Sequence, residues 1–118
     1  TKKKVSFNFT PHLSPMFRGI LSTIYLDIES NISINKVNSK LKDFYKKDTF
    51  VKILPINSYI STNDVVNTNY CFISVCKTKY RNKLIILSAI DNLIKGGAGQ
   101  AVQNLNYYFG YNVKKGLV

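Results

Sequence analysis

Residues 84–90 read Leu-Ile-Ile-Leu-Ser-Ala-Ile, an apolar run interrupted only by Ser88 and followed directly by Asp91 and Asn92. Strands with one solvent-facing side alternate apolar and polar residues, whereas strands covered on both faces carry continuous apolar runs. We therefore predict that residues 84–90 form a strand of a sheet that the rest of the domain covers on both faces.

Strand patterns recur along the chain on the N-terminal side of this segment. Val5-Ser-Phe-Asn-Phe9 alternates apolar and polar residues, which is typical of a half-buried strand. Residues 78–82 have the composition of a hairpin turn, and the polar stretch 56–69 is predicted as a long loop with a possible role in function. The predicted strands are residues 5–9, 20–28, 50–54, 70–76 and 84–90.

Two segments have helical spacing. Residues 36–47 follow a possible cap at Ser33 or Asn35 and carry the apolar stripe Val37, Leu41, Phe44 and Tyr45. Residues 92–109 end before Gly110, which is placed as a C-cap. The stripe of this last helix is Ile94, Ala98, Ala101, Val102, Leu105 and Phe109. The order predicts an α+β domain with a mixed, largely antiparallel sheet and helices on one face.

Length and composition limit the classes of protein. The 118 residues are one domain, too short for a cofactor domain of ordinary size plus a separate substrate domain. The apolar fraction of 45% excludes a disordered chain. No apolar run approaches the roughly 20 residues that cross a bilayer, and no signal-peptide pattern opens the sequence. We expect a cytoplasmic protein with no membrane partner.

The net charge of +11 has two interpretations. It would suit a nucleic-acid interface, and it would equally suit an anionic, phosphorylated substrate or cofactor. Arg18 and Arg81 are the only arginines available for bidentate contacts, and the lysines are spread over positions 2–4, 36–47, 77–83 and 114–115. The spread makes a nucleic-acid partner the weaker alternative.

The two cysteines, Cys71 and Cys76, are predicted to be free. In an extended strand they lie about 16 Å apart on opposite faces, too far for a disulfide. With one histidine in the chain they do not complete a four-ligand zinc site, so we expect no metal. Free thiols fit a reducing compartment.

The glycine-rich segment Lys95-Gly96-Gly97-Ala98-Gly99-Gln100 lies between a predicted strand and a predicted helix. Glycines there leave backbone N–H groups open to an anion, or they allow close packing of the backbone. Val102 replaces the third small residue of a dinucleotide-binding fingerprint, and no Gly-Lys-Ser/Thr follows as in a P-loop. The two interpretations remain open on the sequence alone.

His12 and Arg18 are the candidate functional side chains of the N-terminal part. His12 lies between Pro11 and Pro15; an imidazole can act as an acid or a base, and the alternative is a hydrogen-bonded loop residue. Arg18 precedes Gly19, an arrangement that can hold a carboxylate or a phosphate; the alternative is a surface ion pair.

Two long blocks carry a family resemblance. Phe9-Thr-Pro-His-Leu-Ser-Pro-Met-Phe-Arg-Gly-Ile20 resembles the Phe-Thr-Pro-His-Leu-x-Pro-Met-x-Arg-Gly-Ile block of N-acetyl-gamma-glutamyl-phosphate reductases. Residues 88–106, together with Phe109 and Gly110, resemble the C-terminal helix of the same family. The resemblance implies that residues 1–118 are the C-terminal part of a semialdehyde-dehydrogenase catalytic and dimerisation domain, partial and similar to the C-terminal domain of glyceraldehyde-3-phosphate dehydrogenase.

The resemblance also implies a reaction. Such enzymes reduce N-acetyl-L-glutamyl 5-phosphate with NADPH to N-acetyl-L-glutamate 5-semialdehyde and phosphate, in arginine biosynthesis, through a cysteine thioester. The family's nucleophilic cysteine and basic histidine lie in blocks that this sequence does not contain. No catalytic residue is therefore expected in this chain, and neither Cys71 nor His12 takes those roles. By itself the chain is expected to be inactive.

Site roles follow from the resemblance by position. Arg18 would hold the substrate's carboxylate or phosphate, and His12 would shape that pocket. Asn92, Lys95, Gly96, Gly97 and Gly99 would lie beside the nicotinamide of NADP, with Gln100 facing inward. The last helix, about 92–109, would dock on a Rossmann domain absent from these residues. The parent would be a homodimer or homotetramer.

Two alternatives stay open. One is a stand-alone basic module that binds nucleic acid or an acidic protein. The other is a relative in the same superfamily, either an aspartate-semialdehyde dehydrogenase or the lysine-pathway enzyme that acts on a carrier-protein-linked substrate.

Overall fold

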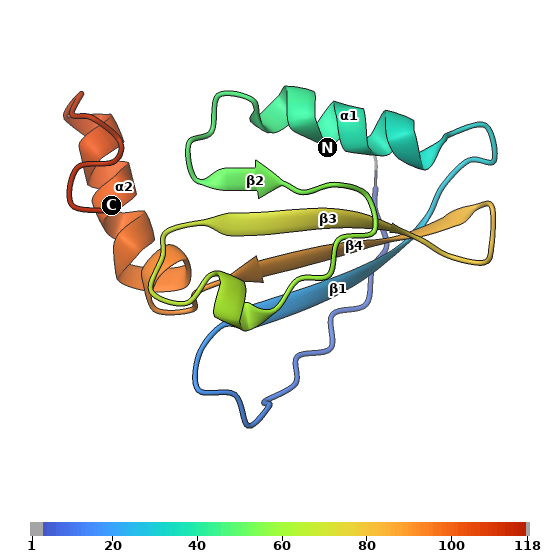
Figure 1. Ribbon diagram of the computed structural model, residues 1–118, viewed down its shortest axis with the longest axis horizontal. Helices are drawn as coiled ribbons and strands as arrows, with labels where there is room; N and C mark the ends of the chain where they lie inside the picture. Colours follow the sequence, from blue (N-terminus) through green and yellow to red (C-terminus); the bar gives the residue numbers. More distant parts are fainter. Residues whose placement is uncertain (1–3, 118) are drawn as a thin grey trace.

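The computed structural model describes residues 4–117. Two short helical turns, Thr62–Asp64 and the wide turn Ile94–Ala98, precede β3 and α2 respectively. The main elements in chain order are β1 (Ile20–Asp27), α1 (Ile34–Tyr45), β2 (Val51–Ile53), β3 (Cys71–Lys77), β4 (Lys83–Ile90) and α2 (Gly99–Tyr108), as drawn in Figure 1.

The strands form one sheet in the order β1-β4-β3-β2. β4 runs antiparallel to both of its neighbours, and the short β2 runs parallel to β3. A mixed, largely antiparallel sheet in an α+β fold is what the sequence predicts, so the fold class is confirmed. The strands at 20–28, 50–54, 70–76 and 84–90 are confirmed within one or two residues.

The pairing of β1 with β4 positions the site. Ile20 lies opposite Ile90 at one end of the pair, and Asp27 lies opposite Lys83 at the other. Because the strands are antiparallel, the residues just before β1 meet the residues just after β4. The two blocks of sequence that carry the family resemblance are thereby brought to the same end of the sheet (Figure 1).

Helix α1 packs on β2 and β3. Its N-terminus is capped by Ser33, whose hydroxyl accepts from the Lys36 backbone N–H, one of the two predicted caps. Asn38 is buried and donates to the Leu54 carbonyl, joining the helix to the end of β2. Val37, Leu41 and Tyr45 are half-buried as predicted, but Phe44 is 74% exposed.

The core is small, and the prediction that residues 84–90 are covered on both faces is wrong. Within β4 only Leu84 and Ala89 are buried, and the residues between them are half-buried. The reason is that α1 covers the β2–β3 half of the sheet, whereas no helix of the described chain packs on β1 or β4. The buried apolar side chains are Phe50, Val65, Val75, Leu84 and Ala89.

Helix α2 differs most from expectation. It stands beyond the end of the sheet and does not share the face that α1 covers (Figure 1). It begins at Gly99, because the backbone of Gly97 leaves the helical conformation and separates the turn at 94–98 from α2. Val102, Leu105 and Phe109, which belong to the predicted apolar stripe, are exposed. Gly110 ends the helix with φ +69°, as predicted.

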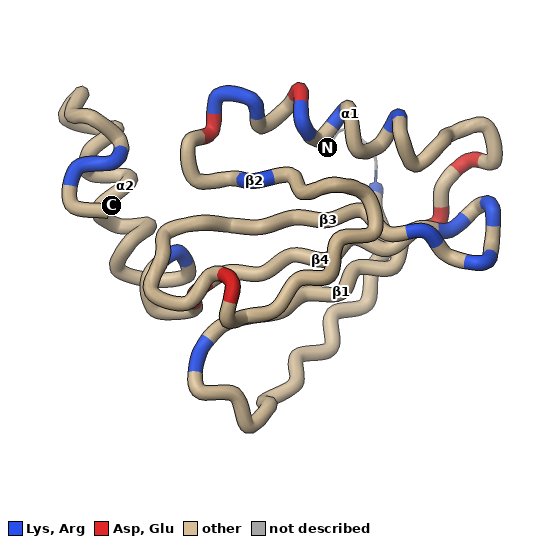
Figure 2. The backbone as a smooth tube through the Cα atoms, in the orientation of Figure 1, with Lys and Arg blue, Asp and Glu red and all other residues tan. Residues whose placement is uncertain are grey.

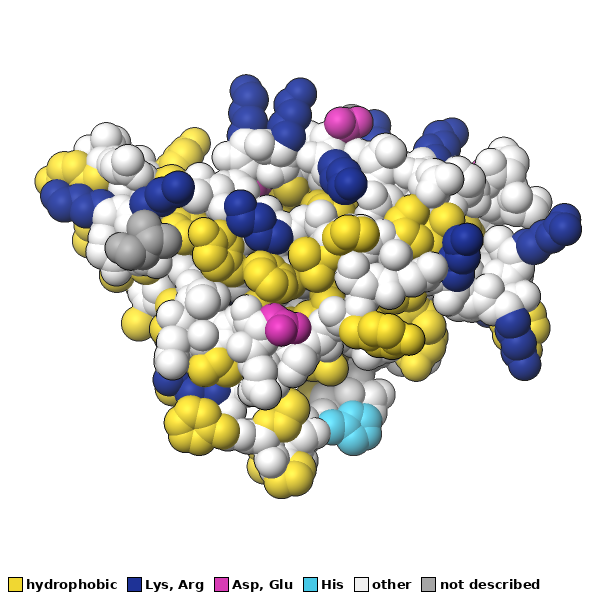
Figure 3. All heavy atoms as spheres, in the orientation of Figure 1, with side chains coloured by type: hydrophobic (Ala, Val, Ile, Leu, Met, Phe, Trp, Pro, Cys, Tyr) yellow, Lys and Arg dark blue, Asp and Glu magenta, His cyan; other side chains and the backbone are white. Residues whose placement is uncertain are grey.

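The predicted strand at residues 5–9 is absent, and the described part of the N-terminal segment, residues 4–19, contains no regular structure. Alternation shows only that two faces differ; a strand also needs a neighbouring backbone to pair with, and here none is available. Phe7, Phe9 and Phe17 are therefore exposed. In Figure 3 apolar side chains gather at the bottom of the molecule, over the loop that leads into β1.

Candidate functional site

A buried carboxylate joins three segments at the end of the sheet where β1 begins and β4 ends. We call the group Arg18, Gly19, Asn67, Asp91 and Asn92 the Asp91 junction. Arg18 and Gly19 come from the N-terminal segment, Asn67 from the loop before β3, and the last two residues directly follow β4. Because these segments are far apart in sequence, only the β1–β4 pairing and the folded 56–69 loop bring them together.

Asp91 accepts four hydrogen bonds. Its Oδ1 accepts from Arg18 Nη2 at 3.1 Å and from the backbone N–H groups of Leu93 and Ile94 at 2.8 and 2.9 Å. Its Oδ2 accepts from the Asn67 backbone N–H at 2.8 Å. Asp91 is fully buried, and burial alone would raise its pKa, but these four donors outweigh burial and lower the pKa below the ordinary value. The carboxylate is therefore ionised at neutral pH.

Arg18 is half-buried and already paired. Besides its ion pair with Asp91, its Nη1 donates to Asn67 Oδ1 at 3.2 Å. Its Nε is buried and has no partner among the described residues. Each terminal nitrogen carries two N–H bonds and uses one, so the guanidinium retains donors for an anion. The alternative that Arg18 forms an ion pair is thus confirmed, but the pair lies inside the fold and not on the surface.

Gly19 and Asn92 form a second connection across the junction. The Gly19 backbone N–H donates to Asn92 Oδ1 at 2.7 Å. Gly19 has φ +108°, and a Cβ at this position would lie 2.6 Å from the Cβ of Thr62. Only glycine fits this backbone and this space. Asn92, predicted to contact a cofactor, therefore has its carbonyl oxygen committed to the fold.

The backbone N–H groups expected to cradle an anion are largely used within the chain. Those of Leu93 and Ile94 bind Asp91, and Gly96 and Ala98 donate to the carbonyls of Asp91 and Leu93. A negative charge therefore already occupies the start of this segment. Gly96 and Gly97 are exposed, so their backbone is open to a flat, uncharged ligand surface.

Gly99 supports the close-packing interpretation. It is buried, and a Cβ there would lie 2.5 Å from both Asn69 Oδ1 and Ile94 Cγ2. Both distances are well inside van der Waals contact, so an alanine at 99 would displace its neighbours. Gly99 thus faces the loop before β3, and its predicted cofactor contact remains a prediction that this geometry does not favour.

Lys95 is held by a side-chain amide on α2. Its Nζ donates to Gln103 Oε1 at 2.8 Å and lies 5.7 Å from the centre of the Phe50 ring. Asn69 Nδ2 donates to the same oxygen at 2.9 Å. Burial lowers the pKa of Lys95, while nearby Cys71 and Asp48 act in the opposite direction.

Gln103, one turn after Gln100, is the glutamine of α2 that contacts the loop before β3. Gln100 Nε2 donates to Asn104 Oδ1, one turn along α2, at 2.8 Å in an exposed pair. Gln103 contacts Asn69 and Lys95 instead. α2 begins at Gly99, so Gln100 lies in its first turn, and the cofactor contact predicted for Gln100 remains a prediction.

His12 lies on the exposed N-terminal segment and makes no hydrogen bond with any other residue in the described range 4–117. The junction therefore brings Arg18, Asn92 and the start of the glycine segment together but leaves out His12. Its predicted role in shaping the substrate pocket remains a prediction.

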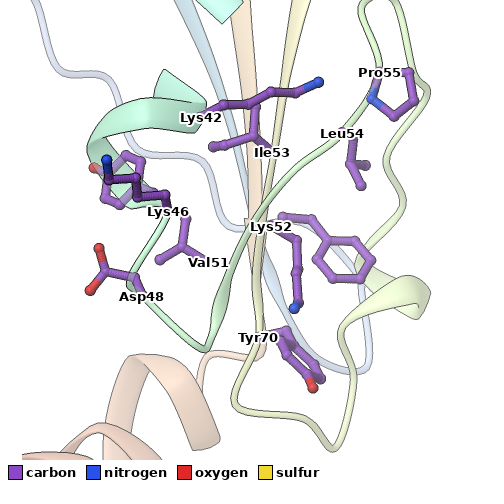
Figure 4. A pocket seen from close by; sticks show the side chains of 11 residues that line it. Lys42, Lys46, Asp48, Val51, Lys52, Ile53, Leu54, Pro55 and Tyr70 are labelled. Carbon is purple, nitrogen blue, oxygen red and sulfur yellow. The ribbon is translucent and has the colours of Figure 1, made fainter. Parts of the chain in front are cut away.

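A separate hollow of about 570 Å³ lies between the end of α1 and β2 (Figure 4). Lys42, Lys46 and Lys52 surround an apolar wall that includes Val51 and Tyr70, and Lys52 Nζ lies 5.3 Å from the centre of the Tyr70 ring. None of the predicted site residues lines this hollow, and we do not assign the candidate site to it.

Basic residues are not gathered on one element. Figure 2 shows them on α1, on β2, on the turn between β3 and β4, and near the C-terminus. Within residues 4–117 no group of three or more His, Cys, Asp or Glu side chains is placed to hold a metal ion. Among the helices of the same range, none has the length and apolar character needed to cross a membrane.

Sequence reasoning missed Asp91, Asn67 and Gln103 as site residues. A signal for Asp91 is present: an aspartate three residues before Ile94 is typical of an N-cap. Asn67 has φ +61°, which asparagine tolerates better than most residues, but no local pattern indicates its partner. Gln103 has no such signal, because only the structure shows which side of α2 contacts Asn69 and Lys95.

Comparison with known proteins gives a consistent picture. The sequence model of the family described as "Semialdehyde dehydrogenase, dimerisation domain" matches residues 1–92. An N-acetyl-gamma-glutamyl-phosphate reductase from Clostridium kluyveri is 48% identical over 117 residues, 99% of this chain and 34% of that protein.

Further relatives have the same name. A Thermoanaerobacter pseudethanolicus reductase is 50% identical over 92% of this chain and 31% of its own length. A reductase from Vesicomyosocius okutanii is 48% identical over 98% of this chain and 32% of its own length. The chain thus spans about a third of the length of the curated relatives that it matches.

Proposed function

Because this chain belongs to the semialdehyde dehydrogenase dimerisation-domain family, we propose that it is the C-terminal part of an N-acetyl-gamma-glutamyl-phosphate reductase. The observation that carries the proposal is 48% identity to such a reductase along 99% of the chain. The reaction is the NADPH-dependent reduction of N-acetyl-L-glutamyl 5-phosphate to the 5-semialdehyde, with release of phosphate. It belongs to arginine biosynthesis.

The chain's own contribution is to hold substrate and cofactor. The nucleophilic cysteine and the basic histidine lie outside these residues, and NADPH supplies the hydride. Arg18 supports the substrate role, because two terminal N–H bonds remain after its bonds to Asp91 and Asn67. A carboxylate or phosphate of the substrate accepts these bonds. His12 contributes to the pocket only after the 4–19 segment packs on another part of the enzyme.

The glycine segment fits the nicotinamide end of NADP rather than a phosphate. Asp91 already accepts from the backbone N–H groups of Leu93 and Ile94 at the N-terminal end of the segment, so these donors are not open to a phosphate. The exposed backbone of Gly96 and Gly97 leaves room for a flat ring. Lys95, fixed by Gln103, lies at the start of the same segment and adds positive charge. The cofactor's own phosphates then bind to the Rossmann domain.

The exposed stripe of α2 supports docking on that domain. Val102, Leu105 and Phe109 are exposed, whereas the buried residues of α2 are Gly99 and Asn106. A helix that places its polar side inward and its apolar side outward fits between two bodies. We assign the stripe to the contact with the cofactor domain, and the parent enzyme to a cytoplasmic homodimer or homotetramer.

The first experiment is the mass of the intact gene product, measured under denaturing and native conditions. A denatured mass near three times 13.4 kDa is expected, because the relatives are about three times longer. A native mass two or four times the denatured mass is expected for the oligomer. A denatured mass near 13.4 kDa would contradict the proposal and favour a binding module.

The second experiment is phosphate-dependent reduction of NADP with N-acetylglutamate semialdehyde, using the intact enzyme in reverse. Arg18→Ala is expected to lower kcat/KM at least 100-fold, since it removes a charge-assisted contact. The matched control is Arg81→Ala, which removes the other arginine from the exposed β3–β4 turn and should retain wild-type kcat/KM. An equal loss in both variants would remove Arg18 from the site.

A further inference from the structure

We infer that Asp91 is a positioning residue that couples the substrate arginine to the cofactor segment, so that one carboxylate sets the affinity for both ligands. The inference rests on the proposed function, since it concerns the same site. Asp91 need not touch substrate or cofactor: it acts through Arg18 on one side and through the 93–99 segment on the other.

On the substrate side, Asp91 sets the direction in which the Arg18 guanidinium points. Arg18 enters from a segment without regular structure, and its guanidinium is held by Asp91 at 3.1 Å and by Asn67 at 3.2 Å. Asn67 is itself held, because its backbone N–H donates to Asp91 Oδ2 at 2.8 Å. One partner of the guanidinium is therefore the Asp91 carboxylate, and the other, Asn67, is held by that carboxylate.

On the cofactor side, Asp91 holds the turn at residues 93–94, which leads into the glycine segment. Asp91 Oδ1 caps the backbone N–H groups of Leu93 and Ile94, and the carbonyl of Asp91 accepts from Gly96 at 2.9 Å. The side chain of Asp91 thus fixes the turn that leads into Gly96 and Gly97. Asn92 completes the connection by accepting from Gly19, the neighbour of Arg18, at 2.7 Å.

The chemistry requires a carboxylate and not an amide. Four donors converge on the two oxygens of Asp91 from three segments. An asparagine has nearly the same shape but one oxygen and one NH₂ group. In either orientation its NH₂ group faces at least one N–H donor. An asparagine therefore releases either Asn67 or both Arg18 and the turn at Leu93 and Ile94. In both orientations it also removes the negative charge that strengthens the hydrogen bonds from Arg18 and from this turn.

The test is Asp91→Asn in the intact enzyme, with the KM values for NADP and for the semialdehyde or phosphate measured separately in the reverse assay. Both KM values are expected to rise at least tenfold, while kcat per folded enzyme falls less. A purely structural role would reduce the folded fraction without changing either KM. The matched control is Asp27→Asn, which removes a carboxylate from an exposed ion pair at the far end of β1 and leaves both KM values unchanged.

Hydrogen exchange at Arg18 tests this inference without an activity assay, and so separates it from the proposed function. In enzyme labelled with ¹⁵N-arginine, the Nε–H of Arg18 is buried and is expected to exchange slowly with solvent. Its resonance is assigned by its loss in Arg18→Lys. Asp91→Asn should speed this exchange at least tenfold, and Asp27→Asn should not.

The outcomes are distinct. Unchanged KM values for both ligands in Asp91→Asn, or an Arg18 signal that exchanges as in the wild type, overturn the coupling. If only one KM rises, Asp91 serves one ligand and the coupling is again rejected. An inactive wild-type enzyme with a slowly exchanging Arg18 signal refutes the proposed reaction while leaving the placement of Arg18 by Asp91 intact.

Discussion

The two ends of strand β1 each carry an ion pair, and the pairs differ in their surroundings. Arg18 pairs with Asp91 at the start of the strand, where the side-chain exposures are 20% and 0%. Lys83 pairs with Asp27 at the other end, with exposures of 48% and 77%. Asp91 has exchanged water for three backbone donors and a guanidinium, whereas Asp27 remains solvated. Two ion pairs of similar composition should therefore contribute differently to stability, because protein donors replace water around Asp91 and not around Asp27.

The largest expected loss of stability follows from removing the buried carboxylate, Asp91, at the start of β1. Asp91→Ala leaves the Arg18 charge and three backbone N–H groups without their acceptor, which should lower the free energy of unfolding by about 3 kcal/mol. Asp27→Ala should lower it by less than about 0.5 kcal/mol. Urea denaturation of both variants measures the difference. Equal losses would show that burial does not distinguish the two pairs.

The next effect concerns the backbone of the buried end. Gly19→Ala combines a positive φ of +108° with a Cβ placed 2.6 Å from Thr62, and should cost about 3 kcal/mol of stability. Gly110→Ala has φ +69° but open space, and should cost about 1 kcal/mol. Thermal unfolding of both variants separates the cost of close packing from that of the dihedral angle. A loss at Gly19 no larger than at Gly110 would mean that Thr62 moves aside.

Acid titration gives a third and smaller difference, because a protonated Asp91 keeps one acceptor oxygen. The pKa of Asp91 is lowered in the folded state, so its contribution to stability is present above the unfolded value of about 3.9 and is lost as the pH falls through the folded value. Stability should therefore decline below about pH 4. In Asp91→Asn this part of the decline should be missing, whereas Asp27→Asn should retain it. Unfolding curves from pH 2 to 7 measure both.

The smallest effect is at the exposed end. Lys83→Ala should change the free energy of unfolding by no more than about 0.5 kcal/mol, and 1 M salt should remove the difference, because the Lys83–Asp27 pair is open to solvent. Denaturation at low and high salt provides the measurement. A loss that persists in high salt would show that the lysine stem, rather than its charge, contributes by packing.

The sequence predicts the strands of the sheet better than it predicts the environment of its helices. Four of five predicted strands are present, since each has an apolar pattern and a partner strand nearby. The strand at residues 5–9 fails for lack of a partner. The apolar stripe of α2 is real in the sequence, but periodicity indicates only that a helix has an apolar side, not what that side contacts.

Site prediction shows the same limit. Arg18 and a segment from Asn92 to Gln100 are predicted from the sequence as site residues, and the structure places Arg18 and the start of that segment against one carboxylate. Asp91 and Asn67 are missed because their function depends on partners 73 and 24 positions away. Gln103 is missed because the start of α2, at Gly99, lies later than its pattern indicates. Contacts between distant segments follow from strand register, which local patterns do not fix.

The order of the strands also determines how long β1 waits for its partner strand during synthesis. β1 ends at Asp27, and β4, its only partner strand in the described sheet, begins at Lys83, 56 positions later. At roughly 5–20 residues per second, a ribosome needs about 3–11 seconds to make the intervening chain. During that interval Ile20, Ile24 and Leu26 emerge on an unpaired strand. Slower translation between the two strands therefore lengthens the time in which the nascent chain can aggregate or be captured by a chaperone.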